Sequence, residues 1–256
     1  MNISIIGTGN VANILARLAL KNEHTICQII ARNEVNGKVL AQLVNADYIN
    51  LQDEPNKNID LCIIAITDEY IESVTEGLSF GNVLVMHTSG SLSMNVLKYV
   101  STNFGVLYPL QSLRKEMEKI PVIPFLIEAN NGDTYNKIET FANTMSEHVT
   151  YMEEDKRLRL HAGAVIVSNF TNYLYGLTET FCKIEEVDFN LLKPLIKETA
   201  IRLENVSALD VQTGPAIRKD ITTLGKHLRL LSAHKRLNIW YTRFTDAIMN
   251  GEPNNL

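Results

Sequence analysis

Apolar residues along the first 150 positions form short continuous runs that alternate with stretches of helical spacing. Continuous apolar runs are typical of strands in a parallel sheet whose two faces are both covered. The run DLCIIAI over residues 60–66 has this character most clearly. Alternating strands and helices with short connections predict an α/β fold with a doubly wound parallel sheet. Its other strands are expected over 2–6, 24–31, 47–49, 82–87 and 104–107, with edge strands over 122–129 and 147–152.

The pattern changes near residue 152, because only helical periodicity continues beyond that point. One long helix is expected from Asp155 to about Lys183. Shorter helices are expected over 191–205, 221–232 and 235–249. The chain is therefore expected to form two domains, with the sheet in residues 1–152 and an all-helical domain in residues 153–256.

The segment Gly7-Thr-Gly-Asn-Val-Ala12 directly follows the first strand and begins a helical pattern. Gly7 allows a tight turn, Gly9 leaves room for a pyrophosphate beside the backbone, and Ala12 lets the helix pack close to the strand. The N–H groups around Asn10 and Val11 would point at the phosphates from a helix N-terminus. This strand, turn and helix predict a Rossmann-like dinucleotide-binding domain, with a purely structural turn as the alternative.

The end of the second strand indicates which dinucleotide is bound. NAD-binding domains usually place an acidic residue about 20 residues beyond the glycine turn, where it holds the ribose 2′-hydroxyl. Here the chain reads Ala31-Arg32-Asn33. The forked guanidinium of Arg32 can instead pair with the 2′-phosphate of NADP. We therefore predict NADP in preference to NAD, the alternative being a surface arginine at a helix start.

Polar residues follow the fourth and fifth strands, at the edge of a parallel sheet where ligands bind. Ala65 and Thr67 end the fourth strand and are expected to contact the nicotinamide half of the cofactor together with Thr88. Thr88 and Ser89, together with Asn172 further along the chain, are expected to orient the substrate or the nicotinamide, and His87 is a candidate proton donor. The alternative is that this segment caps the next helix and that His87 is a structural histidine.

Short polar side chains share one face of the expected long helix. At about 100° per residue, His161, Ser168 and Asn172 fall within about 40° of one another. Solvated faces usually carry Lys and Glu, so we expect His161 and Asn172 to line a cleft, with His161 as a second candidate proton donor. A polar face in water is the alternative.

Arg218 follows the turn signal at residues 213–215 and is a candidate contact for an anionic substrate. A plain turn between two helices fits equally well.

Charge and composition exclude several classes of protein. The net charge of −5 argues against non-specific nucleic-acid binding, which requires basic patches. The three cysteines are isolated in apolar stretches, so we expect buried thiols in a reducing compartment and neither disulfides nor a metal site. The first strand leaves no room for a signal peptide, and no apolar run is long enough to cross a membrane. We expect a cytoplasmic protein.

The motifs together resemble one family, the Rossmann-like NADP oxidoreductases with a C-terminal helical domain of unknown function. These are distant relatives of pyrroline-5-carboxylate reductase, the 6-phosphogluconate and β-hydroxyacid dehydrogenases and the deazaflavin-dependent NADP reductases. The resemblance covers essentially the whole chain and implies a homodimer that packs through the helical domains, with the active site between the two domains. It rests on the glycine turn and on residues 31–33, 87–91, 161–172 and 213–220.

One position departs from the superfamily pattern. The β-hydroxyacid dehydrogenases carry a catalytic lysine four residues before an asparagine on this helix. Asn172 matches the asparagine, but Ser168 stands where the lysine would be. This departure argues against hydroxyacid oxidation with a lysine acid–base. Reduction of an imine or a similar group with a weaker proton donor stays open.

These observations lead to one expected function and two alternatives. We expect an NADP-dependent oxidoreductase that transfers a hydride to or from a small, anionic substrate. A dinucleotide-binding sensor or scaffold dimer without turnover is the first alternative, because the catalytic lysine is missing. A non-redox ligand such as a nucleotide sugar at the glycine turn is the second.

Overall fold

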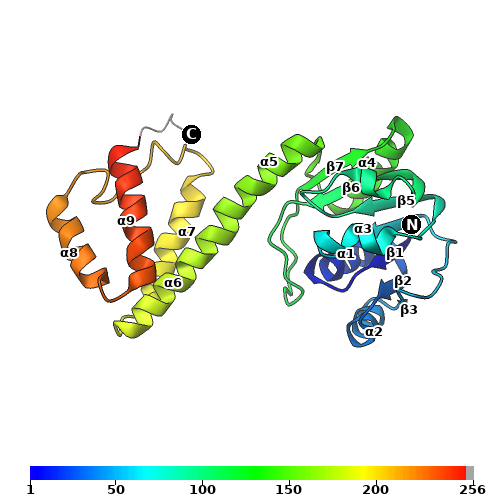
Figure 1. Ribbon diagram of the computed structural model, residues 1–256, viewed down its shortest axis with the longest axis horizontal. Helices are drawn as coiled ribbons and strands as arrows, with labels where there is room; N and C mark the ends of the chain where they lie inside the picture. The colour runs from blue at the N-terminus through cyan, green and yellow to red at the C-terminus, as the bar shows by residue number, and fades with distance from the viewer. Residues whose placement is uncertain (252–256) are drawn as a thin grey trace. The chain divides into compact units, whose positions relative to one another are not determined.

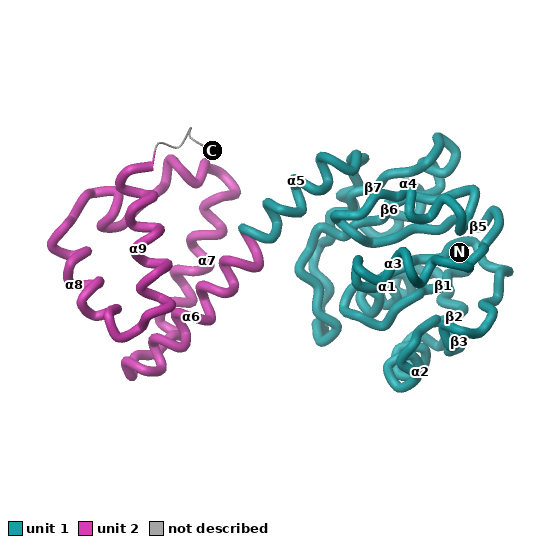
Figure 2. Tube along the Cα trace, viewed as in Figure 1, with its two compact units in different colours: residues 1–166 teal, residues 167–256 magenta. Residues whose placement is uncertain are grey.

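The computed structural model describes residues 1–251 and separates into two compact units, divided between Ile166 and Val167 (Figure 2). The first unit contains the whole sheet, and the second contains only helices. The expected α/β fold followed by a helical region is therefore confirmed.

The sheet of the first unit has eight strands in the order β3-β2-β1-β4-β5-β6-β7-β8 (Figure 1). The strands β1 to β6 pair in parallel, β7 runs antiparallel to β6, and β8 is parallel to β7. The order reverses between β1 and β4, which is where ligands bind in open α/β sheets. The strands are β1 Asn2–Ile6, β2 Thr25–Ala31, β3 Asp47–Asn50, β4 Leu61–Ile64, β5 Gly81–His87, β6 Ser101–Pro109, β7 Phe125–Ala129 and β8 Val149–Tyr151.

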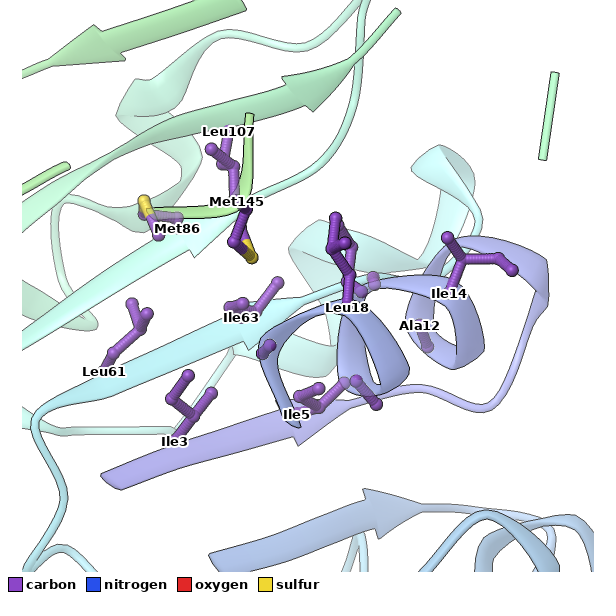
Figure 3. Packing of buried hydrophobic residues seen from close by; sticks show 14 of the residues in the cluster. Ile3, Ile5, Ala12, Ile14, Leu18, Leu61, Ile63, Met86, Leu107 and Met145 are labelled. Carbon is purple, nitrogen blue, oxygen red and sulfur yellow. The ribbon is translucent and has the colours of Figure 1, made fainter. Parts of the chain in front are cut away.

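Helices pack on both faces of this sheet and explain its continuous apolar strands. Ile5 and Ile63 of neighbouring strands pack on one face with Leu18 of α1 (Figure 3). On the other face, Ile64 of β4 belongs to a cluster with Ile71 of α3. Each such buried side chain contributes about 1.5–3 kcal/mol to folding. The helices of this unit are α1 Asn10–Lys21, α2 Glu34–Leu43, α3 Asp68–Thr75, the 3₁₀ turn η1 Met94–Leu97, α4 Gly132–Met145 and α5 Glu154–Ala164.

The sixth strand is longer than the apolar pattern indicates. A strand over 104–107 is expected, but β6 runs from Ser101 to Pro109 because it pairs with β5 over residues 101–106 and with β7 over residues 105–109. The extension places Tyr108 near the carboxyl end of the strand. Tyr108 belongs to a small cluster with Val106 and Leu126 and is only 9% exposed.

The expected long helix contains a six-residue π-helical segment. The helix α5 continues into the π-helix η2 Val165–Phe170 and then into α6 Thr171–Ile184. A π-helix has a different hydrogen-bond spacing from an α-helix. The angular spacing of a regular α-helix therefore does not apply between His161 and Asn172.

The helical unit buries very few apolar side chains. After α6 come the 3₁₀ turn η3 Phe189–Leu192, α7 Lys193–Arg202, α8 Ile221–Leu231 and α9 Lys235–Asn250. Among the described residues of this unit, the buried apolar side chains are Cys182, Ala216, Leu224 and Leu231. Large apolar residues stand in solvent instead, including Val167 and Leu191, which are 72% and 78% exposed. Between residues 1 and 251, no helix has the length and apolar character needed to cross a membrane.

Candidate cofactor and active site

Gly7 closes the turn after β1 in a conformation that other residues rarely adopt. Its φ angle is +123°, and a Cβ atom at this position would lie 2.2 Å from the carbonyl oxygen of Ala65. The neighbouring strand ends are joined by backbone hydrogen bonds. The Gly7 N–H donates to the Ile30 carbonyl at 2.9 Å, and the Ala65 N–H donates to the Ile6 carbonyl at 2.8 Å. Glycine at position 7 therefore lets β1 and the end of β4 lie directly against each other.

Gly9 differs from Gly7 because the space beside it is open. A Cβ atom at Gly9 would meet no heavy atom within 4 Å. Gly9 is also the N-cap of α1, and no side chain caps the first turn of this helix. Below it, Ala12 is fully buried against the sheet, as close helix packing requires. An open space at an uncapped helix N-terminus fits the pyrophosphate of a dinucleotide.

A cavity of about 520 Å³ opens along the carboxyl ends of β1, β2 and β4. The cavity brings together eight of the nine residues predicted to bind the cofactor, and the ninth, Ala12, is buried. Asp68 and Tyr70 of α3 also line it and were not singled out from the sequence. The eight residues are Gly7, Gly9, Asn10, Val11, Arg32, Ala65, Thr67 and Thr88.

Arg32 lies at the β2 end of this cavity. Its guanidinium carbon is 5.7 Å from the centre of the Tyr70 ring, which is within cation–π range. The nearest acidic residue in sequence, Glu34, is paired with Lys38 at 2.6 Å. Within residues 1–251, no carboxylate forms an ion pair with Arg32. The arrangement leaves a guanidinium available to an anion in the cavity.

His87 is fully buried at the end of β5, and both its ring nitrogens have backbone partners. The Ser89 N–H donates to Nδ1 at 3.2 Å, and Nε2 lies 3.3 Å from the carbonyl oxygen of Ser93. Burial, and then the positive charge of Arg157, lower the pKa of His87 to about 4. His87 is therefore neutral at pH 7, and it holds the loop that follows β5.

Asp68 joins the loop after β5 to the start of α3. The hydroxyls of Ser89 and Ser91 each donate to Oδ2 of Asp68 at 2.6 Å. The Ser89 oxygen in turn accepts a hydrogen bond from the Leu92 N–H at 3.0 Å. Asp68 and Leu92 thus fix Ser89, and its hydroxyl hydrogen points to the carboxylate that lines the cavity.

A tyrosine and a histidine meet beside this loop. The Tyr108 hydroxyl is 2.8 Å from Nδ1 of His161, and the two rings are close to perpendicular, at 75°. A Cβ atom on Gly90 would lie 2.9 Å from both His161 Nδ1 and Tyr108 Cζ. Burial, and then the negative charge of Asp68, raise the pKa of Tyr108. The helix position of His161 predicts it as a site residue. Tyr108 lies beyond the expected end of its strand, so the sequence pattern does not predict it.

The start of α5, which carries His161, is anchored by a buried cation. Arg157 is fully buried and forms an ion pair with Glu128 of β7. Its Nη2 atom also donates to the Leu92 carbonyl at 2.7 Å. Because residues four apart lie on the same helix face, this anchor holds the turn directly before His161.

The remaining predicted residues lie in the helical unit. Asn172 is exposed in the first turn of α6, and Ser168 is in the π-helical segment. Arg218 is exposed near the start of α8. There Asp220 caps the helix by accepting a hydrogen bond from the Thr223 N–H at 3.0 Å.

The two glycines of the turn predict opposite effects of the same substitution. Gly7→Ala is expected to destabilise the fold by more than about 1 kcal/mol, because alanine is strained at this φ and meets the Ala65 carbonyl. Gly9→Ala is expected to keep the melting temperature and to weaken dinucleotide binding about 10- to 100-fold, because its methyl group occupies the phosphate space. Thermal unfolding and calorimetric titration measure the two effects. Unchanged binding by Gly9→Ala would place the phosphates elsewhere.

Comparisons with known families agree with this geometry. Residues 2–89 match the family described as "NADP oxidoreductase coenzyme F420-dependent". Residues 123–248 match a domain of unknown function, DUF2520. A comparison with curated proteins found no match.

Solved structures extend the comparison to the whole chain. A protein from Bacteroides fragilis named "putative NADP oxidoreductase" is 34% identical, with a TM-score of 0.88 and 97% of both chains covered. The 1-pyrroline-5-carboxylate reductase from Streptococcus pyogenes is 16% identical, with a TM-score of 0.64 over 97% of this chain and 98% of that one. An imine reductase from Myxococcus stipitatus, in complex with NADP⁺, is 14% identical, with a TM-score of 0.65 over 98% and 95%. The last two are similar in fold alone.

The Bacteroides protein is therefore related to this chain in sequence as well as in fold. The first family match lies within the α/β part, and the second begins at residue 123 in that part and continues through the helical part. The chain belongs to the family of Rossmann-like NADP oxidoreductases that carry a C-terminal helical domain of unknown function.

Proposed function

We propose that the protein is an NADP-dependent oxidoreductase that transfers a hydride to or from a small substrate. The observation that carries this proposal is the single cavity that contains the glycine turn, the free guanidinium of Arg32 and Thr88. The glycine turn would hold the pyrophosphate and Arg32 the 2′-phosphate. Ala65, Thr67 and Thr88 would contact the nicotinamide half. When bound, the cofactor supplies or accepts the hydride.

The selectivity for NADP rests on charge at the end of β2. A 2′-phosphate needs a cation, whereas a 2′-hydroxyl is usually held by an acid. Arg32 faces the cavity, and Glu34 is paired with Lys38. Tyr70 lies beside the guanidinium, which supports a defined position for the arginine over the adenosine end of the site.

Arg32→Ala is expected to weaken NADPH binding about 10- to 100-fold, because a hydrogen-bonded charge pair is worth roughly 1.5–3 kcal/mol. NADH binding should stay unchanged, since NADH lacks the phosphate. Lys21→Ala is the matched control, because it removes an exposed cation at the C-terminal end of α1, away from the glycine turn. Fluorescence titration with both cofactors measures the affinities. Equal affinities that Arg32→Ala leaves unchanged would remove this role from Arg32.

For the substrate side, we propose that Thr88 and Ser89 orient the nicotinamide or the substrate. The hydrogen bonds of Ser89 to Asp68 and to the following backbone support a rigid loop there. His161 is the histidine proposed for acid–base chemistry, because His87 is buried and neutral. Asn172 stays a proposed substrate contact on the grounds of its place on the long helix.

We propose that the substrate is small and anionic. Turnover of such a compound distinguishes an enzyme from a dinucleotide-binding sensor. NADPH consumption is to be measured against imines, keto acids and neutral aldehydes. We expect turnover with at least one class, and a preference for keto acids would support the anionic character. Tight NADPH binding without turnover on any compound would favour a sensor or scaffold.

We propose that the protein is a homodimer joined through its helical units. A unit with few buried apolar side chains cannot be stabilised by its own core alone. Its exposed apolar residues include Val167, Phe170, Leu191 and Leu195, which are 58–78% exposed. A second copy offers the same apolar surface, as a two-fold symmetric interface requires.

The double variant Val167→Asp and Leu191→Asp is expected to shift the protein from dimer to monomer, because it places two charges in the apolar interface. Light scattering should give twice the chain mass of 28.8 kDa for the wild type and the single chain mass for the variant. Tyr99→Asp is the control, because Tyr99 is 84% exposed on the first unit. A monomeric wild type would contradict the proposal.

We also propose that the protein acts in the cytoplasm. All three cysteines are free thiols, and Cys62 and Cys182 are buried. Isolated free thiols are typical of proteins in reducing compartments, which supports this location.

A further inference from the structure

We infer that Tyr108 is the catalytic residue that exchanges a proton with the substrate, and that His161 returns the proton to Tyr108. The inference rests on the proposed function, because a hydride transfer to a carbonyl or imine carbon also requires a proton at the neighbouring oxygen or nitrogen. It concerns a contact between β6 and α5, both in the first unit.

The first support is the geometry of the pair. The 2.8 Å contact between the Tyr108 hydroxyl and His161 Nδ1 is a hydrogen bond of ordinary length. Tyr108 is 9% exposed, so most of its side chain is shielded from bulk water. His161 is half-buried, and within residues 1–251 its Nε2 atom has no recorded hydrogen bond. One nitrogen thus faces the tyrosine, and the other can exchange protons with water.

The second support is the place of the pair beside the cofactor cavity. Asp68 lines the cavity and holds Ser89 and Ser91 on either side of Gly90. Gly90 lies directly against the rings of Tyr108 and His161. The loop after β5 therefore links the cavity to the pair, and β6 ends at the same edge of the sheet as β4 and β5 because the three strands are parallel.

The third support is that separate parts of the chain hold the pair together. A side chain at Gly90 would meet both rings, so a glycine is needed for this contact. Arg157, one turn before His161, is fixed by Glu128 of β7 and by the Leu92 carbonyl. A fully buried arginine is costly unless it is paired and hydrogen-bonded, and here its partners fix the position of α5.

The proton balance is complete with the proposed cofactor. In the reducing direction, the substrate carbon receives the hydride, and the π electron pair of its C=O or C=N bond forms a new O–H or N–H bond. The proton of that bond comes from the Tyr108 hydroxyl. The phenolate regains a proton from His161 Nδ1, and Nε2 takes one from water, which leaves the Nε2–H tautomer. Proton exchange with water through the imidazolium then returns the ring to the Nδ1–H tautomer before the next turnover. Oxidation reverses each transfer.

The charged and titratable groups around the pair favour this assignment. Asp68 from α3 and His161 from α5 face Tyr108, and His87 of β5 is neutral. Arg157 forms its ion pair with Glu128 of β7. A phenol beside a carboxylate holds its proton at pH 7, so Tyr108 is present in the form that can donate one.

The test compares Tyr108→Phe, which removes only the hydroxyl, with Tyr135→Phe. Tyr135 also donates a hydrogen bond, to Glu139 at 2.7 Å, but lies on α4. Tyr108→Phe is expected to lower kcat about 10²- to 10⁴-fold with an unchanged Kd for NADPH. Tyr135→Phe should match the wild type. Nitrogen NMR of the His161 ring gives a readout apart from activity, since the Nδ1 shift should move in Tyr108→Phe alone.

Two further variants test the histidine. Gly90→Ala should separate the two rings and lower kcat to a similar extent although both side chains remain. His161→Ala should lower kcat less, and added imidazole should restore part of the rate, which a purely structural histidine would not allow. Wild-type kcat in Tyr108→Phe, with NADPH still bound, would overturn the inference alone. A wild type that binds NADPH but reduces nothing would overturn the proposed function and this inference with it.

Discussion

The close approach of β1 to the end of β4 is the constraint on which the rest of the site depends. A Cβ atom at Gly7 would lie 2.2 Å from the Ala65 carbonyl, so the two strand ends can meet there only if the residue is glycine. The strand order reverses at this point, and the helices α1 and α3 begin on either side of it. One missing side chain thus sets the position of two helix N-termini and of the cavity between them.

Asp68 links the cofactor cavity to the loop that follows the neighbouring strand β5. It is the first residue of α3, and its carboxylate accepts hydrogen bonds from Ser89 and Ser91 after β5. That loop lies against Tyr108 of β6 through Gly90. Strand ends that are far apart in the sequence therefore lie side by side along the carboxyl edge of the sheet, from Arg32 after β2 to Tyr108 of β6.

The residues that could be predicted are those with a local signal. Gly7 and Gly9 follow a strand and begin a helix, and Arg32 has a fixed spacing from them, so each could be placed from its neighbours in sequence. Tyr108 could not, because its strand is lengthened by pairing with β7, and its partner His161 is 53 residues away. The π-helical segment 165–170 also carries no local mark, since its sequence VIVSNF contains neither glycine nor proline.

Ser168 stands where the β-hydroxyacid dehydrogenases carry their catalytic lysine, and the structure offers another group that could supply the proton. In the β-hydroxyacid dehydrogenases, which the chain resembles, the acid–base group stands on the long helix, so a serine there suggests a protein without turnover. Here the sheet itself supplies a phenol at the end of β6, with a histidine of α5 behind it. The inferred proton donor lies on the sheet, where the β-ladder fixes its distance from the neighbouring strand ends. The exposed apolar residues of the helical unit are then left for the proposed contact between two copies of the chain.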